Sequence, residues 1–349
     1  MKTIVLCGGG TAGHVLPALA LVPLLKRHFD NIVFMGGKYG IEKEIISRHN
    51  IEFIGVENAK LKRQLSLKNA LIPFKLLKGI SEAKKYLKSV MPSAVFSKGG
   101  YAALPVSIAA AMLKIPVICH ESDLSMGLAN KLSLPFCRAL CTSFEPCAKK
   151  IKKAVYTGPP VREELFTGDS SKILKNFMQK KPVILITGGS SGAAYLNSLV
   201  RSCLDSLLSY YNIIHICGKG NLNNLRREGY LQLEFSHNMQ DIFAASDYVV
   251  SRGGSNALFE LMLLKKPSVI IPLPKNASRG DQLQNAEYFE KKGCIITVLQ
   301  QGLDAKKFIG SIKQLADKKN VLIDNIKNSD IRCGNKKIVD VILRYAKSK

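Results

Sequence analysis

The sequence predicts an α/β protein with two Rossmann-like domains, each a doubly wound parallel sheet, that face a central cleft. Short apolar runs alternate with helix-length segments along the whole chain, which is typical of parallel strands covered by helices on both faces. A strand, a glycine-rich turn and a helix start follow one another at residues 2–13, and the same unit recurs at residues 183–193. The length of 349 residues corresponds to about two domains.

The individual elements are expected where these runs lie. Strands are expected at residues 3–7, 32–35, 52–56, 94–97, 116–119, 139–142, 183–187, 213–217, 248–251, 268–272 and 294–298. Helices are expected between them, for example at residues 16–28, 102–113, 193–208, 256–263 and 281–292. Pro23 lies inside the first of these helices and is expected to kink it.

Two adjacent prolines mark the expected boundary between the domains. Residues 157–162 read Thr-Gly-Pro-Pro-Val-Arg, and tandem prolines disfavour helix and suit an extended crossing segment. We therefore expect an N-terminal domain at residues 1–160 and a C-terminal domain at residues 161–335, with a ligand at the carboxyl ends of the strands. Residues 336–349 carry apolar side chains at helical spacing and are expected to pack back on the N-terminal domain.

The charge balance is the one unusual feature of the composition. Lys and Arg number 51 against 26 Asp and Glu, which gives a net charge of +25. Such a field attracts nucleic acid, an anionic membrane or acidic small molecules. A general excess of solvated lysines explains the same number, so charge alone does not decide between these partners.

Cysteine usage and hydropathy indicate a cytoplasmic protein. The nine cysteines are an odd number without any Cys-x-x-Cys pair, which favours reduced thiols over a disulfide framework or a zinc site. The longest stretch without a charged residue, 3–25, is interrupted by glycines and prolines, so no membrane-spanning helix is expected.

The first glycine-rich turn has the Gly8-x-Gly10-x-x-Gly13 spacing of a dinucleotide-binding loop. A nicotinamide site also needs an acid at the end of the second strand to hold the ribose, and none occurs there before Glu42. The pattern therefore disfavours NAD. His14 follows the turn directly, and it either caps and packs the helix start or provides an imidazole for proton transfer.

Three turns in the second half resemble sites for a nucleotide diphosphate. Residues 188–193 offer backbone amides and hydroxyls at a helix start, and residues 252–260 add a glycine pair, polar groups and one acid. Residues 278–285 form a polar cluster that opens another helix. Each turn also has a simpler interpretation as helix capping. All three follow predicted strands, which together favours a nucleotide-diphosphate site.

Taken together, these motifs resemble the MurG family of glycosyltransferases. The resemblance covers essentially the whole chain and keeps the motifs in order: Gly8 to His14, Gly99-Gly-Tyr101, His120 to Asp123 with Asn130-Lys131, Gly158 to Arg162, Gly188 to Ala193, Arg252 to Glu260, and Gln282-x-x-Asn285.

The resemblance implies a GT-B fold and an inverting transferase. N-acetylglucosamine (GlcNAc) would pass from UDP-GlcNAc to the C4 hydroxyl of the muramoyl sugar in undecaprenyl-pyrophosphoryl-N-acetylmuramoyl-pentapeptide (lipid I), giving lipid II and UDP. This step belongs to peptidoglycan synthesis, and so to cell shape and cell division. No metal and no cofactor are implied, because helix N-termini and an arginine would stabilise the leaving diphosphate.

The resemblance also assigns roles to residues by position. His14 is the best candidate for the base that takes the acceptor proton, Asp123 is a second, and Thr11, Ala12 and Gly13 belong to the acceptor side. The residues expected on the donor side are Ser190, Ser255, Asn256 and Ala257 at the diphosphate, Glu260 at the ribose, Gln282 at the GlcNAc hydroxyls, Arg162 at the nucleotide and Ser236 beside the uracil.

Three positions depart from the family pattern. Better-known members read His-Glu-x-Asn where this chain ends the motif in Asp123, so a hydrogen-bond donor becomes a carboxylate. Asp123 is therefore either a substitute sugar contact or an additional base. A Gln-Gln pair is replaced by Asp281-Gln282, and a Gly-Asn-Pro by Gly158-Pro159-Pro160.

The segment from Lys60 to Lys88 is expected to bind the membrane that holds lipid I. It contains nine basic residues against Glu82 alone, interleaved with apolar side chains. Lysines near an anionic leaflet contribute about 1 kcal/mol each, while apolar groups enter between the headgroups. The expected location is peripheral, on the cytoplasmic side of the cell membrane, with other cell-wall synthesis proteins as possible partners. A helix with a solvated basic face is the alternative.

Other functions remain open at this point. Net charge alone favours a nucleic-acid-binding protein, but the chain has no Trp, few aromatic residues and no recognised binding motif, so no nucleic-acid partner is expected. A glycolipid glucosyltransferase and a UDP-GlcNAc epimerase would share the GT-B fold, and the epimerase would not need a membrane-binding face.

Overall fold

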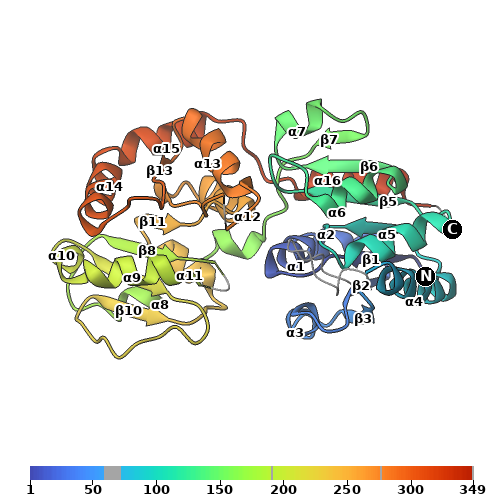
Figure 1. Ribbon diagram of the computed structural model, residues 1–349, viewed down its shortest axis with the longest axis horizontal. Coiled ribbons are helices and arrows are strands. Elements are labelled where there is room, and N and C mark those ends of the chain that lie inside the picture. Colours follow the sequence, from blue (N-terminus) through green and yellow to red (C-terminus); the bar gives the residue numbers. More distant parts are fainter. Residues whose placement is uncertain (59–71, 190–191, 276, 348–349) are drawn as a thin grey trace. The chain divides into compact units, whose positions relative to one another are not determined.

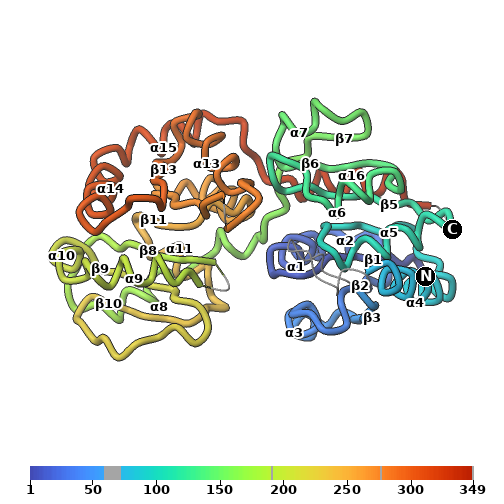
Figure 2. The backbone as a smooth tube through the Cα atoms, viewed as in Figure 1, coloured from blue at the N-terminus to red at the C-terminus, as the bar shows by residue number. Residues whose placement is uncertain are grey.

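The computed structural model describes residues 1–58, 72–189, 192–275 and 277–347. The chain forms two compact units (Figure 1). Unit 1 contains Met1–Arg162 together with Arg332–Lys349, and unit 2 contains Glu163–Ile331. Figure 2 traces the chain from unit 1 into unit 2 and back, so that the C-terminal helix returns to the first unit.

Unit 1 is built on a seven-stranded sheet in which every pairing is parallel. The strands are β1 (Thr3–Cys7), β2 (Asn31–Gly37), β3 (Glu52–Val56), β4 (Ala94–Ser97), β5 (Val117–Glu121), β6 (Ala139–Thr142) and β7 (Ala154–Tyr156). Their order in the sheet is β3-β2-β1-β4-β5-β6-β7. The order reverses between β1 and β4, and ligands of open α/β sheets bind at such a reversal.

The helices of unit 1 connect these strands and cover the sheet. They are α1 (Ala12–Leu19), α2 (Val22–Leu25), α3 (Glu42–Ile46), α4 (Ile72–Val90), α5 (Ala103–Met112), α6 (Leu128–Ser133), the 3₁₀ helix η2 (Leu134–Phe136), α7 (Glu145–Lys149) and α16 (Asn335–Tyr345).

Unit 2 repeats the design with a six-stranded parallel sheet. Its strands are β8 (Val183–Thr187), β9 (Asn212–Ile216), β10 (Tyr230–Leu233), β11 (Tyr248–Ser251), β12 (Ser268–Ile270) and β13 (Ile296–Thr297). Their order is β10-β9-β8-β11-β12-β13, which reverses between β8 and β11. The predicted fold class, two doubly wound parallel α/β domains, is confirmed.

The helices of unit 2 are mostly short. They are η3 (Glu163–Phe166), α8 (Ser171–Leu174), α9 (Ala194–Ser202), α10 (Leu204–Leu208), α11 (Met239–Ala245), α12 (Ser255–Leu263), α13 (Asp281–Lys291), α14 (Ala305–Asp317) and α15 (Lys319–Asn328).

The structure corrects the expected course of the first helix. The sequence predicted one kinked helix at residues 16–28, whereas α1 begins at Ala12 and ends at Leu19, and α2 begins at Val22. Pro23 lies in the first turn of α2. Proline has no N–H to donate to the carbonyl four residues earlier, but its fixed φ suits a helix start, so the chain breaks instead of bending.

Two edge strands were not predicted. β7 and β10 are three and four residues long, and none of their residues is buried. The predicted strand at residues 294–298 is shorter in the structure, where β13 has two residues. Edge strands lack the continuous apolar run of a central strand, so hydropathy gives little signal for them.

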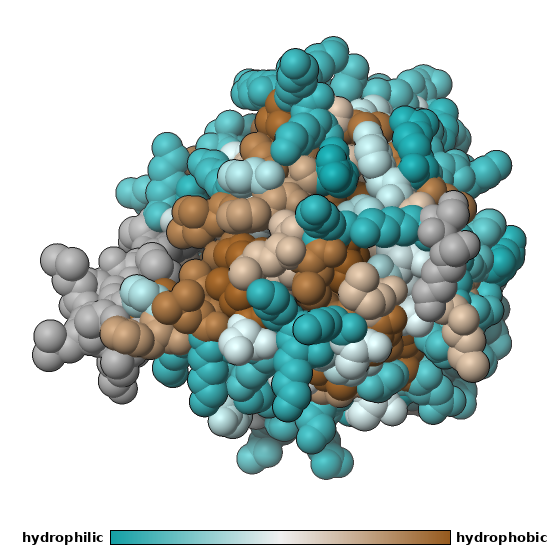
Figure 3. Space-filling model, turned by 90° about the vertical axis from the view of Figure 1, so that its right-hand side faces the viewer, coloured by the Kyte–Doolittle hydropathy of each residue, from teal (hydrophilic) through white to brown (hydrophobic). Residues whose placement is uncertain are grey.

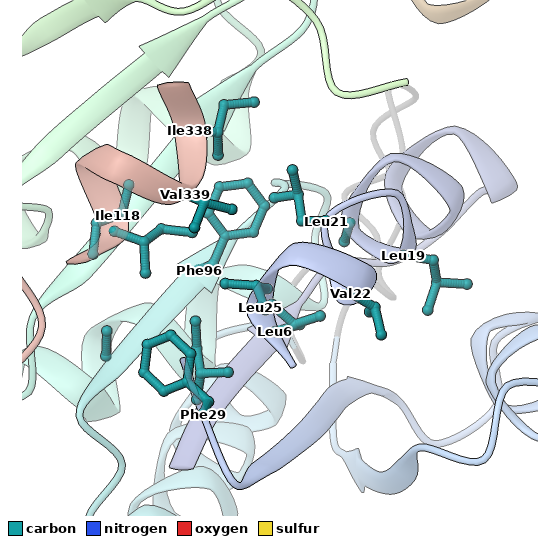
Figure 4. Packing of buried hydrophobic residues seen from close by; sticks show 14 of the residues in the cluster. Leu6, Leu19, Leu21, Val22, Leu25, Phe29, Phe96, Ile118, Ile338 and Val339 are labelled. Atoms are coloured by element: carbon teal, nitrogen blue, oxygen red, sulfur yellow. The ribbon is translucent and has the colours of Figure 1, made fainter. Parts of the chain in front are cut away.

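Successive residues of the central strands of unit 1 enter two different cores. Leu6, Phe96 and Ile118 pack on one face of the sheet against α1, α2 and α16, and Cys7, Val95 and Cys119 pack on the other. The alternation follows from the two-residue period of a strand. Figure 4 shows Ile338 and Val339 of α16 beside the side chains of the first face.

Asn335 fixes the place where the chain returns to unit 1. Its side chain is buried, accepts the Val161 N–H at 3.0 Å and donates to the Val161 carbonyl at 2.8 Å. The Gly334 N–H donates to the carbonyl of Pro159 at 2.7 Å. Gly158 has a φ of 84°, and a Cβ there would lie 2.6 Å from the Arg332 carbonyl oxygen. The departing and returning segments therefore lie side by side.

We predict that Ile342→Ala lowers the free energy of unfolding of unit 1 by about 2–5 kcal/mol, because a fully buried side chain of α16 is replaced by a cavity. Urea denaturation measures this change, and hydrogen exchange of the β4 amides measures it within unit 1. Asp340→Ala, on the exposed side of the same helix, is the control. Equal stabilities of the two variants would contradict the role of α16 in this core.

Candidate active site

The strand reversal of unit 1 brings together the turns that follow β1 and β4. In the first turn, Gly10 has a φ of 94°, and its N–H donates to the Glu42 carboxylate at 2.6 Å. Glu42 is fully buried in the first turn of α3. Glu42 is thus the first acid after the second strand, and it lies on α3 and not at the strand end. Its carboxylate accepts an N–H of the glycine turn.

His14 lies in the first turn of α1, after Thr11 at the N-cap, Ala12 and Gly13. Its Nδ1 lies 3.3 Å from the backbone carbonyl oxygen of Lys98, directly after β4. A carbonyl can only accept, so in a neutral imidazole this contact assigns the proton to Nδ1 and the lone pair to Nε2. The imidazole is therefore in the tautomer that a proton acceptor at Nε2 requires.

The loop after β5 carries Asp123 and is held by Glu121. The Glu121 carboxylate is almost fully buried and accepts the Asp123 N–H at 3.0 Å, the Gly127 N–H at 2.9 Å and the Asn130 amide at 2.9 Å. Burial and the nearby charge of Asp123 raise the pKa of Glu121. Glu121 thereby fixes the backbone that presents the half-buried Asp123.

Lys98 is the member of this cluster that sequence reasoning missed. Its side chain is 1% exposed, and its ammonium donates to the Ser122 hydroxyl. Burial lowers the pKa of Lys98 to about 8, against the opposing effect of the carboxylates of Glu121 and Asp123. Burial and the Lys98 charge hold the pKa of the fully buried His120 well below its usual value. The sequence signal that could have revealed Lys98 was its position, directly after an apolar strand and before Gly99.

Unit 1 therefore gathers its candidate residues at one edge of its sheet. His14 contacts the Lys98 carbonyl, and the Lys98 ammonium lies against Ser122 and in electrostatic range of Asp123. Both predicted base candidates thus belong to one polar cluster around Lys98. Their roles stay predictions.

The strand reversal of unit 2 brings together the turns after β8 and β11. Ser190, expected at the diphosphate, lies outside the described residues. Ser255 is buried at the start of α12, and Asn256, Ala257 and Glu260 are half-buried on its first turns. The N-terminus of this helix is the kind of site that favours negative charge.

The first turn of α13 lies against the first turn of α12. A Cβ on Gly253 would lie 2.5 Å from the Gln282 carbonyl oxygen, so glycine allows this approach. The buried Asn285 donates to the Gly253 carbonyl at 3.4 Å. The Gln282 side chain accepts the Leu273 N–H at 3.0 Å, which leaves its amide NH₂ as the donor. The structure thus brings two of the three predicted turns together.

The remaining donor-side candidates are on other elements than α12 and α13. Ser236 follows the edge strand β10, two strands from β8, and its hydroxyl accepts the Asn238 N–H at 3.1 Å. Phe235 beside it is 52% exposed. Arg162 is the last residue of the first stretch of unit 1. Within the described part of the chain, no three His, Cys, Asp or Glu side chains group as metal ligands.

Comparison with known proteins identifies the class. The glycosyltransferase family 28 N-terminal domain matches residues 4–142, and the family 28 C-terminal domain matches residues 183–342. The two sheets with their glycine-rich turns are thus the two halves of a family 28 glycosyltransferase.

Individual relatives narrow this class. The UDP-N-acetylglucosamine–N-acetylmuramyl-(pentapeptide) pyrophosphoryl-undecaprenol N-acetylglucosamine transferase of Clostridium botulinum (strain Loch Maree / Type A3) is 47% identical over 99% of this chain and 100% of its own length. The transferase of that name from Clostridium tetani (strain Massachusetts / E88) is 45% identical over 99% and 98%. Acinetobacter baumannii MurG superposes with a TM-score of 0.76 at 25% identity, covering 99% of this chain and 100% of that one. The chain belongs to the MurG family.

Proposed function

We propose that this protein transfers GlcNAc from UDP-GlcNAc to the C4 hydroxyl of the muramoyl sugar of lipid I, with inversion, and so makes lipid II for peptidoglycan synthesis. The observation that carries the proposal is the identity of 47% along the entire length of a transferase with this name. The arrangement of polar groups at both strand reversals supports it, because each lies where α/β sheets bind their ligands.

Unit 2 holds the donor in this proposal. As the bond from the sugar C1 to the diphosphate breaks, negative charge grows on the leaving UDP. The adjacent N-termini of α12 and α13 stabilise that charge, together with Ser190, Ser255, Asn256, Ala257 and Arg162. Glu260 accepts hydrogen bonds from the ribose hydroxyls, Gln282 binds the GlcNAc hydroxyls, and Ser236 lies beside the uracil. These groups provide by hydrogen bonds what a metal ion provides in other sites.

Unit 1 holds the acceptor. The C4 hydroxyl oxygen attacks C1 from the face opposite UDP, so the new bond forms as the old one breaks and the configuration inverts. His14 takes the hydroxyl proton at Nε2, where its hydrogen bond to Lys98 places the lone pair. Asp123 either binds the acceptor sugar or shares this role. Thr11, Ala12 and Gly13 line the start of the same helix.

We expect UDP release from UDP-GlcNAc that depends on lipid I and continues in excess EDTA, because helix N-termini and side chains stabilise the leaving group. A coupled UDP assay measures it, and mass spectrometry of the lipid product identifies a GlcNAc addition. Sugar epimerisation without lipid I would indicate an epimerase instead. Transfer that needs a divalent ion would contradict the metal-free donor site, and a glucosyl product would overturn the choice of donor.

His14→Ala is expected to lower kcat by about 10²-fold or more, since general base catalysis contributes typically 10²–10⁴-fold.

Asp123→Asn separates the two interpretations of Asp123, because the amide is what better-known members carry. If Asp123 is a sugar contact, kcat of Asp123→Asn stays within about tenfold of wild type, and a larger loss shows that it takes a proton. Full activity of His14→Ala would exclude His14 as the base.

The exposed side of α4 supports membrane binding. Gly79, Ala83 and Leu87 form its buried face, and the carboxylate of Glu82 ties it to Lys38 at 2.6 Å and to the Glu57 N–H at 2.7 Å. The only acid of the basic segment is thus used to hold the helix. The outer side presents lysines and two large apolar side chains, Phe74 at 70% and Leu77 at 64% exposure. Residues 60–71 of the segment lie outside the described chain.

Neighbouring elements extend this surface. Exposed apolar side chains also lie on α5, which packs against α4, and on α6 and η2, which pack against α5: Met112, Leu128, Leu132 and Phe136. A hollow of about 370 Å³ beside Phe136 is lined by Lys114, Arg138 and Lys153. Figure 3 shows an apolar patch bordered by hydrophilic side chains on the face it displays.

This combination of apolar and cationic groups fits an anionic leaflet. None of the helices in the described ranges is long and apolar enough to cross a membrane. We propose that the protein lies peripherally on the cytoplasmic face of the cell membrane, where lipid I is held and where other cell-wall synthesis proteins would meet it.

Lys75→Glu with Lys78→Glu is expected to weaken binding to vesicles with anionic lipid at least about tenfold, because each basic residue near the surface contributes about 1 kcal/mol. Vesicle sedimentation at physiological salt measures the change. Lys306→Glu with Lys313→Glu, on exposed positions of α14 in unit 2, alters the net charge equally and serves as the control. An equal loss in both double variants would mean that net charge alone drives binding.

A further inference from the structure

We propose that Lys98 is a positioning residue of the acceptor side: its backbone carbonyl orients His14, and its buried ammonium fixes the Ser122–Asp123 turn. One residue would thereby set the geometry of both base candidates. The inference rests on the proposed function. Lys98 follows β4, and it contacts residues that follow β1 and β5.

The backbone of Lys98 is itself held firmly. Its N–H donates to the Cys7 carbonyl at 2.8 Å, which continues the pairing of β1 with β4 by one residue. A Cβ on Gly8 would lie 3.3 Å from the Lys98 Cβ and 2.6 Å from the His14 carbonyl oxygen. Glycine at position 8 therefore allows the turn after β1, which carries His14, to lie against Lys98.

The side chain of Lys98 reaches the loop after β5. Its ammonium donates to the Ser122 hydroxyl and lies in electrostatic range of Glu121 and Asp123. Glu121 in turn accepts the N–H of Asp123 and two groups further along the loop. The attraction between the ammonium and these carboxylates offsets part of the cost of burying them. The ammonium also balances the charge of Asp123, which stands where better-known members of the family have an amide.

Burial of the ammonium makes the stability of the fold depend on pH. Because burial lowers the pKa of Lys98, the folded chain binds its proton less tightly than the unfolded chain does. Stability from this group is therefore lowest at pH values below about 8 and rises with pH as the ammonium loses its proton. Removing one member of a buried group of opposite charges leaves the others without their partner, so a Lys98 variant is judged by its activity and pH profile and not by its stability alone.

The charged and titratable groups that face Lys98 are His14 on α1 and His120, Glu121 and Asp123 at the end of β5. Above about pH 8 the ammonium is lost while the carboxylates remain, so the turn that carries Asp123 loses its compensating charge. Transfer activity should then fall. A chain with a neutral residue at position 98 has no such transition.

The test compares Lys98→Met and Lys98→Gln with Lys266→Met. Lys266 is a half-buried lysine of unit 2 that donates to the Ser246 carbonyl at 2.7 Å, so it controls for the loss of a buried ammonium outside the site. We measure kcat, KM for UDP-GlcNAc, the pH profile from 6.5 to 9.5 and Tm. Gln keeps a donor for Ser122 without the charge, and it replaces Met if that variant does not fold.

For Lys98 variants that remain folded, as Tm shows, we expect kcat to fall about tenfold or more, KM for UDP-GlcNAc to stay within about twofold, and the loss of activity above about pH 8 to disappear. Lys266→Met should keep the wild-type kcat and pH profile. An unchanged kcat, or a loss of activity above about pH 8 that persists in the folded Lys98 variants, would overturn the proposal. Wild-type enzyme that does not use lipid I would instead overturn the proposed function itself.

Discussion

The reversal of strand order in each parallel sheet is the constraint on which the rest of this protein depends. Between β1 and β4, and again between β8 and β11, consecutive connections leave the sheet in opposite directions. Space opens at the carboxyl ends of those strands, and polar residues can lie there without disturbing either core. The glycine-rich turns, the starts of α1 and α12 and the Lys98 side chain all lie at these two reversals.

The two reversals differ in the interactions that they offer a ligand. In unit 2, the converging starts of α12 and α13 provide fixed dipoles, which suit the growing charge of a departing diphosphate. In unit 1, the first glycine turn is engaged by Glu42, and the site is instead a cluster of titratable groups around a buried ammonium. In the proposed function, one half stabilises an anion and the other holds and moves a proton. This division matches a transferase in which one substrate leaves as an anion and the other loses a proton.

The proposed acceptor is anchored in a bilayer, and the proposal assigns both membrane binding and acceptor binding to unit 1. The helix that offers Phe74 and Leu77 packs on α5, and α5 covers the sheet whose strand ends carry His14 and Asp123. The returning helix α16 fills the opposite core and closes the unit through Asn335. In the proposed function, membrane contact and proton transfer therefore both belong to unit 1.

The sequence by itself determined the fold class, the central strands and the family, because these depend on local runs such as residues 3–7 and 183–187 and on turns that each lie within a few residues. It also placed His14 and Asp123 at strand ends. It did not reveal β7 and β10, whose short, incompletely buried runs carry little hydrophobic signal. Only the tertiary structure showed that Glu42 hydrogen-bonds Gly10, 32 residues away. It also showed that Lys98 contacts His14, 84 residues away, and Ser122, 24 residues away. Such pairings follow from strand order and burial, which no local pattern encodes.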